Sequence, residues 1–422
     1  MNEDFLYYLW TYKLVKHNPT ITTGEQIQII TPGIRNHDSG PDFFNAMIKI
    51  GETSWAGNVE MHVNSSDWFK HKHQNNHSYD NIILHVVYNN DKIVRRLNSE
   101  VIPTLELKNK FDPVIFSNYQ NFLNSRNSIP CHNQIYQIKL FERLSWFDRL
   151  MSERLEQKSD EIIELLELSK NDLMQVFYQR LARSFGYTSN ADAFEQLSSA
   201  IPLNLLTKHK DNLMQIESLL YGQSGLLPTI QPDDYTSNLE KEWDFLRRKY
   251  SLVPMEGSLW KFMRMRPVSF PTIRISQFAN LIYNSEGLLN DILEADKLQY
   301  VISLLSVAAS PYWDNHYQFE KLAVGKTKKL GLSSIYIILI NTIIPTLFVY
   351  GKMKNDIALQ EKALSWLVEI KPESNTITRE FKLMGITAEN ASQSQALIQL
   401  KNNYCSKKRC LNCRFGHVLL NR

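Results

Sequence analysis

Hydrophobic and polar residues follow two different periods along the chain, and the change lies near residue 135. Before it, short apolar runs separated by Gly, Pro and Asn predict strands at 25–33, 45–52, 57–63, 81–90 and 101–107. After it, apolar residues recur every three or four positions, as in "LFERLSWFDRLMSERLEQKSDEIIELLELS" (140–169), which is typical of helices. The pattern predicts an α+β protein, with a mixed-sheet α/β domain over 1–130 and a larger all-helical domain over 131–422.

The longest apolar run, "SSIYIILINTIIPTLFVYGK" (333–352), contains Asn341 and Pro345. We interpret it as a buried helix that Pro345 kinks, with a membrane-spanning helix as the alternative. The first residues, "MNEDFLYYLW", carry acids where a signal peptide has a basic flank. We therefore expect a cytoplasmic protein that does not act on membranes.

Composition changes this picture little. The 422 residues are too many for one typical core, and 43% apolar and 22% charged residues are ordinary for a globular protein. The formal net charge of +3 does not by itself indicate a nucleic-acid binder, although a local basic groove remains compatible with it.

Candidate chemistry is concentrated in "GPDFFNAMIKIGETSWAGNVEMHVNSSDW" (40–68). In the strand "NVEMHV", Glu60 and His62 alternate with apolar residues and so share one face. If this strand pairs antiparallel with the preceding one, Asp42 at the start of that strand lies beside them. Two carboxylates and an imidazole in one place predict a site for Mg²⁺ or Mn²⁺.

Pro41-Asp42 followed by Glu60-Met61-His62 resembles the signature of the PD-(D/E)xK nucleases. The resemblance implies a restriction-endonuclease-like fold and hydrolysis of DNA or RNA phosphodiesters, with Asp42 and Glu60 as metal ligands. His62 would stand in place of the signature lysine. Because a neutral histidine lacks the permanent charge of lysine, the alternative is a non-catalytic nucleic-acid-binding or assembly factor with this fold.

A second arrangement of metal ligands lies in "SSDWFKHKHQNNHSYDNIILHVV" (65–87). Asp67, His71 and His73 have residue types that suit a zinc hydrolase, and they could also contact substrate. His85 lies in a strand that is predicted to be buried, so we expect it to have a hydrogen-bond partner.

In the helical half, "WKFMRMRPVSFPTIRISQF" (260–278) places Arg264, Arg266 and Arg274 among aromatic residues. Arginines interleaved with aromatic rings can hold phosphates and stack on bases, so these arginines are candidate substrate-binding residues. The alternative is a structural brace between the domains, with the arginines paired to acids.

Four cysteines occur, and Cys405, Cys410 and Cys413 are clustered near the C-terminus. In a chain without a secretory signal, such clustering favours a metal site over disulfides. A closed site needs a fourth ligand, for which Cys131 is the remaining cysteine, and His132 or His417 could substitute. Both Zn²⁺ and a [4Fe–4S] cluster accept this set.

Over nearly its full length the chain also resembles an uncharacterised family found mainly in Bacteroidetes. The resemblance rests on stretches that include "EDFLYYLW", "GPDFFNA", "GNVEMH", "SSDWFKHKH", "RPVSFPTIRISQFA" and "YCSKKRCLNC". This family implies no activity.

Overall fold

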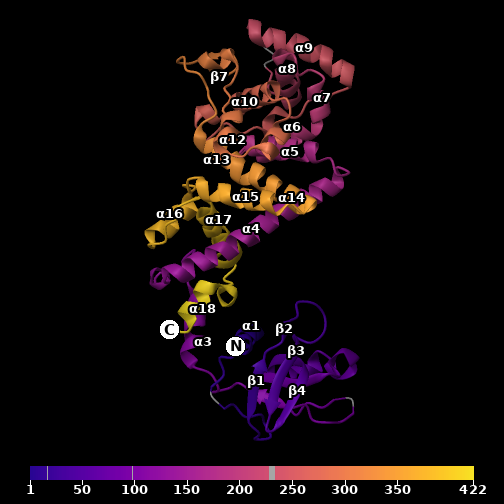
Figure 1. Ribbon diagram of the computed structural model, residues 1–422, viewed down its shortest axis with the longest axis vertical. Helices are drawn as coiled ribbons and strands as arrows, with labels where there is room; N and C mark the ends of the chain where they lie inside the picture. Colours follow the sequence, from indigo (N-terminus) through magenta and orange to yellow (C-terminus); the bar gives the residue numbers. More distant parts are fainter. Residues whose placement is uncertain (17, 97, 228–232) are drawn as a thin grey trace. The chain divides into compact units, whose positions relative to one another are not determined.

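A computed structural model describes residues 1–16, 18–96, 98–227 and 233–422 (Figure 1). The chain forms two compact units. The first comprises residues 1–146, 380–386 and 398–422, and the second comprises 147–379 and 387–397. The predicted α+β class is confirmed, because a mixed sheet with helices is followed by a largely helical region. The last 25 residues, which the sequence pattern assigned to the helical domain, lie in the first unit.

The first unit is built on a six-stranded sheet in the order β1-β3-β4-β5-β6, with β2 paired to β3. Figure 1 labels β1 to β4 of this sheet. β1, β3 and β4 are antiparallel, whereas β4, β5 and β6 are parallel. The strands are β1 (Ile27–Thr31), β2 (Ile34–Arg35), β3 (Phe43–Ile50), β4 (Thr53–Asn64), β5 (Ile82–Asn89) and β6 (Thr104–Glu106). All five predicted strands are present, and β2 is additional.

The central strands are covered on both faces. Residues 82–87 of β5 are all buried, as expected for a parallel strand with no solvent-facing side. Glu60 and His62 on β4 are buried as completely as their apolar neighbours. Helix α1 (Glu3–Thr11), which begins after the cap Asn2, packs on β4. The crossover from β4 to β5 contains α2 (Asp67–Lys70), η1 (His73–Asn75) and η2 (His77–Tyr79).

The end of the β3–β4 hairpin near Asp42 is irregular. The register shifts between Phe43 and Ala46, and Asn45 has a φ of 56°. Phe43 pairs with Val59, so Asp42 lies next to Glu60 on the neighbouring strand. Such a bulge re-aims the side chains beside it, and it lies where the sequence predicts the chemistry.

The remainder of the first unit comes from both ends of its sequence. Helix α3 (Pro113–Asn124) packs against α18 (Arg414–Leu420) and the short turn η9 (Cys410–Asn412). The turn η3 (Ile135–Gln137) follows α3, and the π-helical turn η8 (Leu400–Cys405) precedes η9. Helix α4 (Leu140–Leu168) begins in this unit and continues into the second.

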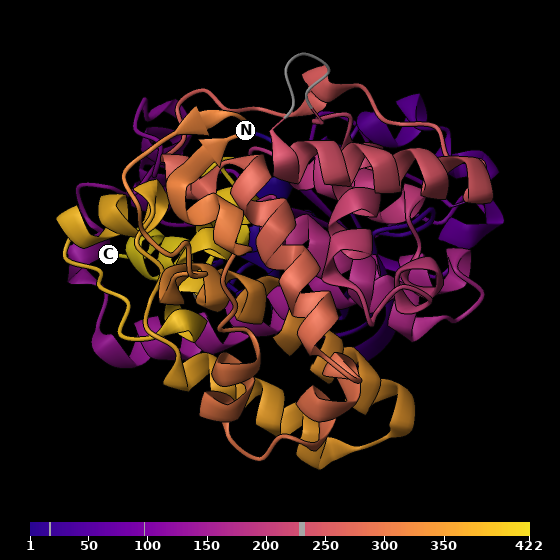
Figure 2. The same ribbon diagram turned by 90° about the horizontal axis from the view of Figure 1, so that it is seen from above.

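The second unit is a helical array with one large apolar core (Figure 2). Neighbouring helices pack in pairs, namely α5 with α6, α8 with α9, α8 with α10, and α14 with α15. Its helices are α5 (Leu173–Phe185), α6 (Ala191–Ala200), α7 (Leu203–Thr207), α8 (Leu213–Ser224), α9 (Asp234–Tyr250), α10 (Pro271–Asn284), α11 (Leu288–Glu294), α12 (Leu298–Leu304), α13 (Leu332–Ile338), α14 (Ile344–Lys354), α15 (Ile357–Glu369), α16 (Thr376–Leu383) and α17 (Ala391–Gln399). A small hairpin, β7 (His316–Gln318) and β8 (Lys321–Leu322), was not predicted.

The apolar run forms one continuous helix, Leu332–Lys354, whose length and mean hydropathy of 2.0 would suffice to cross a membrane. Within its most apolar window 67% of the residues are buried inside the protein, as is common for a core helix. A π-helical turn (Leu339–Ile343) precedes Pro345, whose ring nitrogen cannot donate to the preceding turn. This agrees with the predicted buried helix.

Candidate metal centre

Asp42 and Glu60 lie side by side in the first unit and are joined through the backbone. The Asp42 N–H donates to Glu60 Oε2 at 3.2 Å, and the Met61 N–H donates to Asp42 Oδ2 at 3.0 Å. The strand pairing fixes these contacts, so the two carboxylates predicted to converge do share one place.

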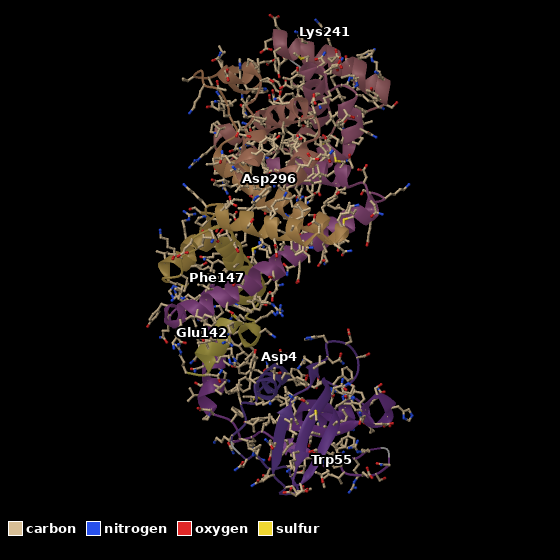
Figure 3. The ribbon with its side chains drawn as sticks, viewed as in Figure 1. Asp4, Trp55, Glu142, Phe147, Lys241 and Asp296 are labelled. Carbon is tan, nitrogen blue, oxygen red and sulfur yellow. The ribbon has the colours of Figure 1, made fainter. Side chains whose placement is uncertain are left out.

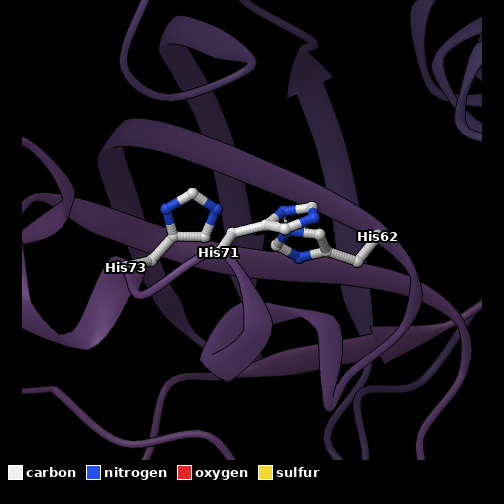
Figure 4. A group of neighbouring side chains, drawn as sticks. All are labelled: His62, His71 and His73. Carbon is white, nitrogen blue, oxygen red and sulfur yellow. Dashed lines mark hydrogen bonds between the residues drawn. The ribbon is translucent and has the colours of Figure 1, made fainter.

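Three imidazoles gather at the same place (Figure 4). The ligand nitrogens of His62, His71 and His73 all lie within 4.8 Å of one another, although no ion is present. His62 comes from β4, whereas His71 and His73 come from the crossover that follows α2. Glu60 Oε1 lies 3.2 Å from His73 Nε2 and 3.6 Å from His62 Nε2. The carboxylate pair and the histidines therefore form a single cluster.

Hydrogen bonds orient His62 within this cluster. His62 Nε2 lies 3.1 Å from His71 Nδ1, and His62 Nδ1 lies 2.8 Å from His85 Nε2. His85 thus has the partner that its buried strand position predicts. A histidine ligand commonly binds a metal through one ring nitrogen while the other is hydrogen bonded, which is the arrangement available to His62.

Burial sets the charge state of the cluster. Burial raises the pKa of both Asp42 and Glu60, and the repulsion between the two carboxylates adds to the effect at Glu60. Burial also lowers the pKa of His73, and together with the neighbouring histidines it lowers the pKa of His62 to about 2. Near neutral pH the imidazoles of His62 and His73 are therefore uncharged, which is the form that binds metals.

The residues fit a cation. His73 Nε2 is buried and, among the described residues, has no partner with hydrogen-bond geometry, even though Glu60 Oε1 is only 3.2 Å away. A buried polar atom without a hydrogen bond costs stability. A divalent ion between Glu60 and the imidazoles would satisfy that nitrogen and offset the buried carboxylate charge. Glu60, His62, His71 and His73 are the side chains that could hold it.

Asp67, the third member of the alternative ligand set, lies outside this cluster. Its carboxylate accepts from the Asn64 N–H at 3.0 Å and pairs with Lys70 Nζ at 2.5 Å. The zinc-type set proposed from the sequence thus keeps its two histidines, while Glu60 rather than Asp67 lies beside them.

Tyr7 and Arg35 complete the surroundings, and sequence reasoning missed both. The Tyr7 hydroxyl donates to Glu3 Oε2 at 3.4 Å, and the Arg35 guanidinium carbon lies 3.2 Å from the centre of the Tyr7 ring. Both residues lie near enough to Asp42 to lower the pKa of its carboxyl against the larger effect of burial. One terminal nitrogen of Arg35 is buried without a hydrogen-bond partner among the described residues. The available signal was weak: Glu3 and Tyr7 are four residues apart on one helix face, at the start of a chain segment rich in aromatics.

A cavity of about 500 Å³ borders Tyr7 and Arg35. Its wall also includes Asp4, which Figure 3 labels, as well as Tyr8, Tyr12 and Arg409. Trp55, labelled in the same figure, lies on β4 outside this wall and is 40% exposed. The cavity brings two arginines and three tyrosines to one concave surface within the first unit.

The arginines singled out in the helical half do not form one surface. Arg274 on α10 is buried and donates to the Tyr187 hydroxyl at 2.6 Å and to Gln277 Oε1 at 2.9 Å. Arg264 and Arg266 are exposed in the loop before that helix. Arg274 therefore helps to hold the core of the second unit together through a hydroxyl and an amide of that unit, and not through the acids that the alternative interpretation expected.

The four cysteines lie together. Cys131, Cys405, Cys410 and Cys413 are buried, unpaired by disulfides, and line one small cavity in the first unit. Among the other candidate ligands, His132 is exposed, and His417 Nδ1 lies 3.0 Å from the Tyr8 hydroxyl. Cys131 is thus the residue that the fold places with the C-terminal three.

Comparison with known proteins bears on the family alone. A family model described as a protein of unknown function (DUF2851) matches residues 3–376. No curated protein and no solved structure matches the chain. The expected membership in an uncharacterised family over nearly the full length is confirmed, because the match covers most of both units. The chain belongs to the DUF2851 family of proteins of unknown function.

Proposed function

We propose that the first unit is a metal-dependent phosphodiesterase that hydrolyses the backbone of a nucleic acid. The observation that carries the proposal is the meeting of Glu60 with His62 and His73, at 3.6 Å and 3.2 Å, beside a second carboxylate. The resemblance of Asp42, Glu60 and His62 to the PD-(D/E)xK signature supports the same reaction class.

The donor set favours a transition metal. Imidazole nitrogens suit Mn²⁺, Zn²⁺ or Fe²⁺, whereas Mg²⁺ prefers oxygen ligands alone. With three histidines next to Glu60, we expect Mn²⁺ or Zn²⁺ to bind more tightly than Mg²⁺. When bound, such an ion would polarise the phosphate and lower the pKa of a water molecule.

The protein side chains would divide the remaining work. Asp42, which accepts from the Met61 N–H, lies where it can accept a proton from the attacking water. Arg35 offers an unpaired guanidinium nitrogen to a phosphate oxygen. It would supply the positive charge that His62 lacks in place of the signature lysine.

The adjoining cavity supports a nucleic-acid strand as substrate. Tyr7, Tyr8 and Tyr12 provide aromatic faces, while Arg35 and Arg409 provide charges for a phosphate backbone. Aromatic rings interleaved with arginines bind unpaired bases better than duplexes, whose bases are already stacked. We expect single-stranded DNA or RNA to be cut in preference to duplex.

The test is a cleavage assay with Mn²⁺, Zn²⁺ or Mg²⁺ on single- and double-stranded DNA and RNA, and on a small phosphodiester. Glu60→Gln and His73→Ala should lower the rate by about 100-fold or more, the scale for loss of a catalytic group. His77→Ala is the matched control, because this exposed histidine of the same crossover pairs with Asp80 at 3.0 Å. Cleavage that survives Glu60→Gln, or no cleavage with any of these ions, would contradict the proposal.

One observation favours the second candidate, a non-catalytic nucleic-acid-binding or assembly factor. Burial lowers the pKa of His62 so far that it carries no charge near neutral pH, unlike the lysine it would replace. Oligonucleotide binding that is unchanged by a chelator and is not followed by cleavage would support this candidate instead.

A further inference from the structure

The second chemical centre of the first unit is the cavity lined by its four cysteines. Cys131 follows helix α3, Cys405 ends the π-helical turn η8, Cys410 begins η9, and Cys413 directly precedes α18. Each side chain is 7–8% exposed. The cavity between them has a volume of about 10 Å³, and its wall is completed by Phe122, Pro130, Tyr404, Arg409 and Gly416. Three separate segments therefore converge on one enclosed space through sulfur atoms.

Four buried thiols that face one cavity offer a complete set of soft ligands. No disulfide joins these cysteines, whose sulfurs come from three separate segments. A bound soft metal would replace the four thiol protons and be held by thiolates, the ligands that such metals prefer.

The distances between the cysteine sulfurs distinguish a site for a single zinc ion from a site for a metal cluster. Four thiolates around one Zn²⁺ at about 2.3 Å lie about 3.8 Å from one another, by the geometry of a tetrahedron. Among the residues that the structure describes, the three histidines are the one set of three potential ligands whose atoms all lie within 4.8 Å. The sulfurs of Cys131, Cys405 and Cys410 are therefore not all as close together as a zinc site requires, although they face the same cavity as Cys413.

We propose that Cys131, Cys405, Cys410 and Cys413 bind a [4Fe–4S] cluster. A cubane places an iron atom in front of each thiolate, so its four sulfur ligands stand farther apart than those that share one ion. On binding of a cluster whose core charge is 2+, each thiol loses its proton to solvent and forms one Fe–S bond, with no change in the oxidation state of iron or sulfur. The site is separate from the Asp42–Glu60 centre and does not depend on the proposed hydrolysis.

Nearby residues suit this group. Lys401 Nζ donates to the Ser128 carbonyl at 2.6 Å and Lys408 Nζ donates to the Ser125 carbonyl at 3.2 Å, both in the segment that leads to Cys131. Such cations would offset the net negative charge of a cluster held by four thiolates. Gly416 brings α18 close to η9, since a Cβ there would lie 2.0 Å from the Cys410 carbonyl oxygen. This approach keeps Cys410 and Cys413 on the same side of the cavity.

The cluster would join the C-terminal segment to the region after α3. Arg409, Leu411 and Asn412, which lie between the cysteines in sequence, form part of the wall of the cavity that borders Tyr7 and Arg35. Loss of the cluster is thus expected to loosen that wall as well as residues 398–422.

The test is purification of the full chain without oxygen, followed by reconstitution with sulfide and equal amounts of ferrous and ferric iron, which together supply the oxidation level of the cluster. We expect a brown protein with about four iron and four acid-labile sulfide per chain and the visible spectrum of a cubane cluster. Cys131→Ser should lose most of this iron, whereas His132→Ala, the neighbouring exposed residue, should keep it. Glu60→Gln should also keep it, which separates failure here from failure of the proposed hydrolysis.

Two results would overturn the assignment: one tightly held zinc that iron and sulfide do not displace, or wild-type protein that retains neither metal. Both are measured on the wild-type chain by elemental analysis. The conclusion therefore does not depend on whether a cysteine variant folds.

Discussion

The orientation of His62 by His85 gives a quantitative test of the metal centre. His85 is fully buried on β5, and its Nε2 lies 2.8 Å from His62 Nδ1. For His62 to bind an ion through Nε2, its proton must reside on Nδ1, and His85 Nε2 is the acceptor for that proton. His85→Leu, which has a similar volume, removes the acceptor. His85→Gln offers an amide oxygen at a comparable reach and is the matched control.

The expected loss is one outer hydrogen bond to a metal ligand, which costs 10- to 100-fold in affinity, or about 1.4–2.8 kcal/mol. The stability of the metal-free protein should change less. The variant leaves His62 Nδ1 unpaired but also removes His85 Nδ1, which is buried without a partner among the described residues. These two effects, each about 1–3 kcal/mol, oppose one another.

Calorimetric titration of metal-free protein with Mn²⁺ or Zn²⁺ measures the affinity, and thermal unfolding measures the stability. His85→Gln should retain most of the wild-type affinity. If folded His85→Leu protein binds the ion as tightly as wild type, then His62 is not a ligand oriented by His85, and the proposed geometry is wrong.

Three further predictions concern one buried lysine and two glycines. Burial lowers the pKa of Lys158 to about 7 from its ordinary value of 10.5, so the folded protein binds fewer protons than the unfolded chain between these values. Stability measured by urea unfolding should therefore rise from pH 7 to pH 10, by up to about 1.4 kcal/mol per pH unit, and Lys158→Met should flatten this rise. Gly57→Ala places a Cβ 2.4 Å from Ile83 Cγ2, so calorimetric unfolding should show the first unit destabilised by about 1–3 kcal/mol. Gly416→Ala should lower the iron content after reconstitution, because its Cβ would meet the Cys410 carbonyl oxygen.

The glycine predictions have a common control. Gly331→Ala adds a Cβ that meets nothing within 4 Å, and its backbone φ of −68° suits any residue. It should leave both stability and iron content near wild type. A Gly57→Ala protein as stable as Gly331→Ala would mean that β4 and β5 can separate slightly without cost. A titration curve for Lys158→Met that parallels wild type would show that another group governs the pH dependence.

The alternation of apolar and polar residues predicted most strands of the sheet and the meeting of its two carboxylates with His62. Alternation along β4 placed Glu60 and His62 on the same face, and the antiparallel partner brought Asp42 beside them. The observed limits of β3 and β4 differ by a few residues from the predicted limits. The hairpin turns at Gly51, which has a φ of 54°, and β4 begins directly after Glu52. Strand β2 has two residues, too few for any period to be detected.

The positions of His71 and His73 could not be predicted from the local sequence pattern. His71 and His73 lie in an irregular crossover, where no period fixes the direction of a side chain. The sequence could name them as ligands but grouped them with Asp67, which instead bonds Asn64 and Lys70. Only folding of the crossover onto β4 placed them beside Glu60.

The sequence by itself determined the class of the protein, most strands and helices, and the kinds of chemistry that its carboxylates, histidines and cysteines can perform. These follow from periodicity and residue type, which are local properties. Tertiary structure decided which ligands meet: Cys131 lies more than 270 positions before Cys405 yet lines the same cavity, while Arg274 turns into the core. The physical reason is that burial and hydrogen bonding depend on which side chains are close in space. The periodicity of the sequence gives no information about the spatial distance between residues that are far apart in the chain.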